Sequence, residues 1–285
     1  MKADLKFASL PKSFWATVRS VSQEVGYTVR GEGQVKVPTI GEIRQAFDNL
    51  RLNPDCIGDA KNPTELANTL LAYYEHRANV LNKFVEPRLM DVKRAKFEFQ
   101  ALKKKLKPSC PIPLNKQKGK KKAPAYFTGI INMLIEANSS GLPCDFDPRE
   151  LTTVTRNGAP LRTLARRVDG AFPSAVNPVA IWEVKEYYYT TTFGSRVADG
   201  VYETLLDGME LEELREHENV KVLHYLMLDA HYTWWDCGKS YLCRIIDMLH
   251  MDYTDEVLFG YEVIERLPEL VKSWVSLVSR AQKRP

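Results

Sequence analysis

Three side chains with complementary chemistry lie close together in the middle of the sequence. Asp169 precedes a turn, and Glu183 and Lys185 follow that turn. Alternate residues of a β-strand point to the same face, so Glu183 and Lys185 are expected on one side of a strand. A hairpin through residues 172–178 would bring Asp169 beside Glu183. Two neighbouring carboxylates suit Mg²⁺, and the lysine offers a positive charge to a water molecule or a phosphate.

A half-buried hairpin with a solvated Glu–Lys pair is the competing interpretation. Exposed pairs of this kind are common and contribute little to stability. However, bulky residues stand on both sides of the Glu183–Lys185 pair in the sequence. Trp182 directly precedes the pair, and three tyrosines at 187–189 follow it. These neighbours predict a central strand, where charged groups need a specific reason to be present.

The order of Asp169, Glu183 and Lys185 resembles the PD-(D/E)xK nuclease superfamily, which includes most type II restriction endonucleases. Val168 stands where the superfamily usually has proline. The resemblance covers roughly residues 124–235. It implies an α/β (α+β) fold with a restriction-endonuclease-like core, in which helices flank a mixed central sheet.

The resemblance also implies roles for individual residues. Asp169 and Glu183 would hold Mg²⁺, and the backbone carbonyl of Val184 would be a further ligand. Lys185 would position or deprotonate the attacking water. Glu136, near the end of a helix that precedes the strands, would complete the site. The type and position of Glu136 fit a solvent-facing helix end equally well.

A basic stretch beside the expected nuclease core is the main candidate for DNA contact. Its lysines are Lys116, Lys118, Lys120, Lys121 and Lys122. Clustered lysines bind phosphates by releasing counterions, although a solvated linker would have the same composition.

Two residues after the third strand are further candidates for contact with phosphate. Ser195 and Arg196 open a predicted helix, and a helix N-terminus with a hydroxyl and a guanidinium binds phosphate well. Capping of the helix is the simpler role for Ser195.

The sequence predicts three parts. Residues 1–107 show helical periodicity, and Thr39 followed by Glu42 is typical of a capping box. Residues 108–124 are basic and framed by prolines, which favours a linker or loop. Residues 125–285 read as helix, three strands, helix, strand and further helices, the order that the resemblance implies for the nuclease core.

Composition is that of an ordinary globular chain. Of its 285 residues, 44% are hydrophobic and 27% are charged, and no apolar run could span a bilayer. The cysteines are odd in number and form no CxxC pair, which argues against disulfides and zinc. We expect a cytoplasmic protein without a membrane segment. No ATP-binding loop is visible, so no nucleotide cofactor is expected.

The function expected from these features is Mg²⁺-dependent hydrolysis of DNA. The first hypothesis is a type II restriction endonuclease that cuts double-stranded DNA at a specific site and leaves 5′-phosphates. A palindromic site would require two active centres and therefore a homodimer. The alternatives are a non-specific nuclease or a repair or phage-defence nuclease of the same fold, and a non-catalytic DNA-binding protein.

Overall fold

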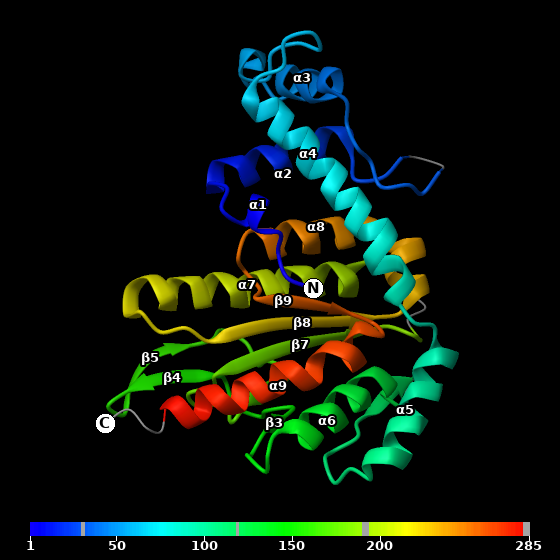
Figure 1. Ribbon diagram of the computed structural model, residues 1–285, viewed down its shortest axis with the longest axis vertical. Helices are drawn as coiled ribbons and strands as arrows, with labels where there is room; N and C mark the ends of the chain where they lie inside the picture. The colour runs from blue at the N-terminus through cyan, green and yellow to red at the C-terminus, as the bar shows by residue number, and fades with distance from the viewer. Residues whose placement is uncertain (30–31, 118–119, 190–193, 282–285) are drawn as a thin grey trace.

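The computed structural model describes the backbone of residues 1–29, 32–117, 120–189 and 194–281. A mixed β-sheet lies between two layers of helices, and further helices from the N-terminal part of the chain lie beyond one of these layers (Figure 1). The expectation of a mixed sheet flanked by helices is therefore confirmed. None of the helices in the described part of the chain is long and apolar enough to cross a lipid bilayer.

The five-stranded sheet has the order β3-β6-β7-β8-β9. The strands are β3 (Asp145–Phe146), β6 (Gly170–Phe172), β7 (Ala180–Glu186), β8 (Leu223–Asp229) and β9 (Glu256–Phe259). The pairs β3/β6 and β6/β7 are antiparallel, whereas β7/β8 and β8/β9 are parallel. Helices cover both faces of the sheet. The inner strand β8 is therefore a nearly continuous apolar run, as expected for buried parallel strands.

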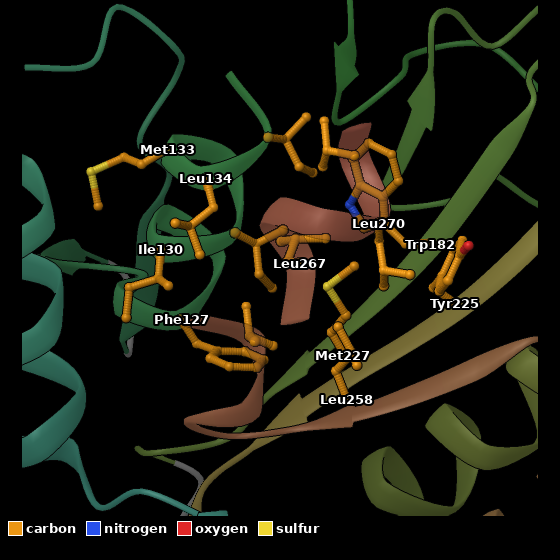
Figure 2. Close-up of a cluster of buried hydrophobic side chains, with 14 of the residues drawn as sticks. Phe127, Ile130, Met133, Leu134, Trp182, Tyr225, Met227, Leu258, Leu267 and Leu270 are labelled. Carbon is orange, nitrogen blue, oxygen red and sulfur yellow. The ribbon is translucent and has the colours of Figure 1, made fainter. Parts of the chain in front are cut away.

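One face of the sheet carries an apolar core (Figure 2). It is covered by α5 (Val92–Leu106), α6 (Tyr126–Asn138) and α9 (Glu262–Ala281). Leu134 of α6 lies beside Leu267 of α9, and both belong to one cluster with Trp182 of β7 and Met227 of β8. Trp182 stacks on Trp274, with ring centroids 5.7 Å apart, and fixes α9 against the strand.

The opposite face is covered by α7 (Ser195–Glu218) and α8 (Lys239–His250), which connect the parallel strands. Val197 and Val201 of α7 pack in one cluster with Leu226 and Leu228 of β8. Because side chains alternate along a strand, the residues of β7 on either side of Trp182 and Val184 face this helical layer. Glu183 and Lys185 are among them, and both are buried.

The N-terminal part of the chain is helical, as its periodicity predicts. Its helices are α1 (Leu5–Ala8), α2 (Lys12–Val25), α3 (Ile40–Asn49) and α4 (Glu65–Val80). A short 3-10 turn (Pro54–Cys56) precedes α4, and a π-helical turn (Leu81–Val85) and a second 3-10 turn (Glu86–Arg88) follow it. The capping box is confirmed, because Thr39 and Glu42 exchange side-chain and backbone hydrogen bonds. The N-terminal helices lie beyond α8, away from the sheet (Figure 1).

Two small hairpins and one further π-helical segment complete the fold. They are β1 (Leu114–Gln117) with β2 (Lys120–Pro124), β4 (Thr153–Arg156) with β5 (Ala159–Thr163), and the segment Tyr232–Cys237. The first hairpin lies in the segment predicted as a linker or loop. Its prolines stand before β1 and at the end of β2, and Ala125 N donates to Pro113 O at 2.8 Å, which closes the hairpin.

Gly170 is required by the packing of the sheet. A Cβ atom at this position would lie 2.1 Å from the ring of Trp182, which is held between β7 and Trp274.

We expect Gly170→Ala to lower the free energy of unfolding by about 1–3 kcal/mol or more, because the rigid ring of Trp182 cannot move aside. Urea unfolding measures this loss. Gly41→Ala is the control, since its nearest neighbour is 3.9 Å away, and an equal loss in both variants would contradict the packing argument.

Candidate functional site

The pairing of β6 with β7 places Asp169 beside Glu183. Gly170 is the register partner of Trp182, so the residue before it faces the residue after Trp182. Asp169 N donates to Glu183 Oε1 at 3.3 Å, and Val184 N donates to Asp169 Oδ2 at 2.7 Å. The sequence predicts one strand over residues 161–169 that runs up to Asp169, but β5 ends at Thr163, and Asp169 instead directly precedes β6.

Glu183 and Lys185 form an ion pair on the face of β7 that α7 covers. Lys185 Nζ lies 2.9 Å from Glu183 Oε2, and the Glu183 side chain is 0% exposed. Gly200 of α7 makes room for the lysine, because a Cβ there would lie 3.1 Å from Lys185 Cδ. The alternative of a solvated pair on an outer face therefore does not apply to these residues.

Three further charged residues complete this arrangement, and none of them was predicted from the sequence as a site residue. Arg166 Nη1 lies 2.8 Å from Glu183 Oε1 and 2.7 Å from Asp207 Oδ2. Lys185 Nζ also lies 2.8 Å from Glu203 Oε2. Glu203 and Asp207 are one helical turn apart on α7, and this spacing was the available signal.

We call these residues the ion cluster: Asp169, Glu183, Glu203, Asp207, Arg166 and Lys185.

The two partners at the centre of the ion cluster keep each other charged. Burial alone would raise the pKa of Glu183, but Lys185 and Arg166 outweigh burial and lower it. Burial likewise disfavours the charged form of Lys185, but Glu183 and Asp169 outweigh this effect and raise the pKa of the lysine. A carboxylate and an ammonium therefore face each other at neutral pH.

The two outer aspartates behave differently. Loss of solvent around the carboxyl group and the negative charge of Glu183 raise the pKa of Asp169 to about 6. The residue as a whole is nevertheless exposed. Burial and the same charge raise the pKa of Asp207 to about 7, against the effect of Arg166. Loss of solvent is the larger cause of both raised pKa values, and the excess of acids over bases in the ion cluster adds to it.

The ion cluster fits a divalent cation in its charge and donor types. Its excess of carboxylates matches a doubly charged ion, and Asp207 Oδ1 is buried with no hydrogen-bond partner among the described residues. In the described parts of the chain, no group of three or more His, Cys, Asp or Glu side chains is arranged to hold a metal ion. Mg²⁺ does not need such a group, because it takes one or two carboxylates with waters and a phosphate.

The backbone of Val184 also suits this role. In a strand, the N–H and C=O of one residue point to the same edge. The Val184 N–H points to Asp169, so its carbonyl faces the same side, beyond the residues that β6 pairs. Asp169, Glu183 and the Val184 carbonyl thus border one position at the end of β6.

The remaining candidates lie elsewhere or outside the described side chains. Glu136 is not brought to the ion cluster, because α6 covers the opposite face of the sheet. It accepts hydrogen bonds from Ser109 N at 3.2 and 3.1 Å and ties the end of α5 to α6. The side chains of residues 116–122, with the lysines proposed to contact DNA, lie outside the described residues, as do those of Ser195 and Arg196.

Residues 90–274 match the family described as "Domain of unknown function (DUF7687)", and the chain belongs to this family. Residues 1–84 match a second description, "Domain of unknown function (DUF7690)". The sheet and the ion cluster fall in the first region, and α1 to α4 fall in the second. No curated protein and no solved structure matches the chain.

The raised pKa of Asp207 makes stability depend on pH. Its pKa is about 7 in the folded chain, well above the ordinary value near 4, so its contribution is complete at low pH and is lost as pH rises through 7. As pH rises from 5 to 7, the free energy of unfolding of the wild type should fall by up to about 1.4 kcal/mol per pH unit relative to that of Asp207→Asn. Urea unfolding in EDTA measures this difference.

Asp199→Asn is the matched control, because Asp199 is an exposed aspartate on the same helix. Its pH profile should run parallel to that of the wild type. A parallel profile for Asp207→Asn as well would show that Asp207 is ionised throughout this range.

Proposed function

We propose that this chain is a Mg²⁺-dependent nuclease that hydrolyses phosphodiester bonds in DNA. The observation that carries the proposal is the meeting of Asp169, Glu183 and Lys185 at the β6–β7 pair, with Asp169 N 3.3 Å from Glu183 and Lys185 Nζ 2.9 Å from it. The topology supports the proposal, since α6, the antiparallel strands β3, β6 and β7, the crossover helix α7 and the parallel strand β8 follow in the order that the resemblance implies.

Each residue at this position has a chemical role in the proposal. Asp169, Glu183 and the Val184 carbonyl would hold Mg²⁺, which when bound stabilises the negative charge that develops on the phosphate. Lys185 orients the attacking water with its ammonium group. The water oxygen gives up a proton to solvent and bonds to phosphorus, and the 3′ oxygen leaves and takes up a proton from solvent, which gives a 5′-phosphate and a 3′-hydroxyl.

Arg166 and Glu203 act on these groups and not on the substrate. Arg166 bonds to both oxygens of Glu183 and holds the carboxylate in place, so it is a positioning residue. The side chain of Glu203 is 40% exposed and is the outer partner of Lys185. It keeps the lysine oriented when no phosphate is present.

The substrate proposed here is double-stranded DNA in the cytoplasm, cut at a specific site by a homodimer in the manner of type II restriction endonucleases. A plasmid digest in Mg²⁺ tests this finer proposal. Discrete bands support a site-specific enzyme, and a smear supports a non-specific or repair nuclease of the same fold. A gel shift without cleavage supports the non-catalytic DNA-binding alternative.

A purely structural ion network is the second candidate, and a specific observation favours it. Both oxygens of Glu183 already have cationic partners in Lys185 and Arg166. Breaking a buried ion pair of this kind costs about 3–5 kcal/mol. The two candidates therefore differ in which property is lost first when one partner changes, the activity or the stability.

Asp169→Asn separates these candidates, because Asp169 has an exposed edge and the amide has almost the same shape. We expect cleavage to fall by about 10²-fold or more, since an amide binds Mg²⁺ poorly, while the free energy of unfolding changes little. Lys185→Met should also abolish cleavage. Asp48→Asn and Lys272→Met, both at exposed helical positions, are the matched controls and should keep full activity. Full activity in Asp169→Asn would exclude this site.

Metal dependence gives an independent test of the donor set. Oxygen ligands suit Mg²⁺ and Mn²⁺, so either ion should restore cleavage to protein treated with EDTA. Ca²⁺ should bind without supporting turnover, because it holds its ligands in looser geometry. Cleavage rates with each added ion measure this order. Cleavage that persists in excess EDTA would rule out the proposed mechanism.

A further inference from the structure

A cavity of about 530 Å³ lies where the N-terminal helices meet the α/β core. It is lined by the end of α2 and the following Tyr27, by α7 and by α8. The cavity is large enough for a small organic ligand. It therefore joins the two regions of the chain that match separate families.

The charges around this cavity favour an anion. Arg19 and Arg244 both line it, and within the described residues neither forms an ion pair with a carboxylate. Asp247 is the acidic residue of the lining, but its charge is already neutralised. Arg77 Nη1 lies 3.0 Å from both of its oxygens, and the Tyr73 hydroxyl donates to it at 2.5 Å. The positive charges of the two arginines are thus not neutralised by a carboxylate, and guanidinium groups match phosphate oxygens well.

The same wall offers aromatic surface. Tyr27 and Tyr202 line the cavity, and Tyr202 is 54% exposed. Arg244 connects them, with its guanidinium 5.1 Å from the Tyr27 ring centroid and Nη1 3.1 Å from the Tyr202 hydroxyl. A ligand with a planar ring would stack on this aromatic surface.

We propose that this cavity binds a free nucleotide, with its phosphate at Arg19 and Arg244 and its base against a tyrosine ring. The sequence has no glycine-rich phosphate loop, and here arginine side chains take over that role. The cavity does not include any residue of the ion cluster, and binding does not require nuclease activity.

The position of α7 links this site to the ion cluster. Val201, Tyr202 and Leu205 of α7 line the cavity, while Glu203 on the same helix holds Lys185. A nucleotide that orders or shifts this turn of α7 would change the position of Glu203. We therefore expect it to change the rate of DNA cleavage, and this coupling, unlike binding, rests on the proposed function.

Titration calorimetry on the whole chain, without DNA or Mg²⁺, tests the binding. The probes are AMP, GMP, CMP and UMP, compared with adenosine and with inorganic phosphate. At least one monophosphate should bind with Kd on the order of 10–100 μM, and more tightly than either fragment. Arg19→Gln and Arg244→Gln should each weaken binding about tenfold or more, whereas Arg244→Lys should retain part of it. Arg156→Gln, which changes an arginine on β4, should leave affinity unchanged.

Several results would overturn the proposal. They are no binding by any monophosphate, equal affinity for inorganic phosphate or adenosine, and unchanged affinity in Arg19→Gln. Arg19 is exposed on α2, so this variant keeps the test valid if Arg244→Gln does not fold. A 5′-phosphorylated oligonucleotide that binds where monophosphates do not would place a strand end in the cavity, and a free nucleotide would then be excluded.

Discussion

The burial of Glu183 is the constraint on which the site depends. A fully buried carboxylate is stable only beside compensating charge, and Lys185 and Arg166 supply it from β7 and from the segment before β6. These cations in turn require partners, which Glu203 and Asp207 of α7 provide. Ion pairs therefore hold β7 and the crossover helix α7 together, in addition to the apolar contacts of Ile181 with Leu211 and Leu214.

The other face of the sheet carries a large apolar core, and its two carboxylates, Glu186 and Asp229, are hydrogen-bonded to Thr128 and Tyr188. Trp182 anchors that face by stacking on Trp274, and its ring lies so close to Gly170 that no side chain fits there. The same close approach fixes the register of β6 on β7. Since Asp169 immediately precedes Gly170, an apolar contact on one face determines which carboxylate meets Glu183 on the other.

Much of this arrangement follows from local rules of sequence. Alternation along a strand predicts that Glu183 and Lys185 share a face, and the turn at 172–178 predicts that Asp169 lies near them. Local rules do not say which layer a helix joins. For this reason Glu136 was expected near the site, although α6 packs on the opposite face, and the acids of α7 were missed. The hairpin β1–β2 was missed because its lysines have low strand propensity.

The helix α7 has two sides with different tasks, and this has a mechanical consequence. Its inner side presents Glu203 and Asp207 to Lys185 and Arg166, and its outer side contributes Tyr202 to the cavity beside Arg244. Gly200 allows the helix to approach Lys185 closely, so a small rotation of this turn would change contacts on both sides at once. Packed interfaces of this kind switch between discrete arrangements and do not deform gradually. We therefore propose that ligand binding in the cavity and the charges of the ion cluster are coupled through this helix.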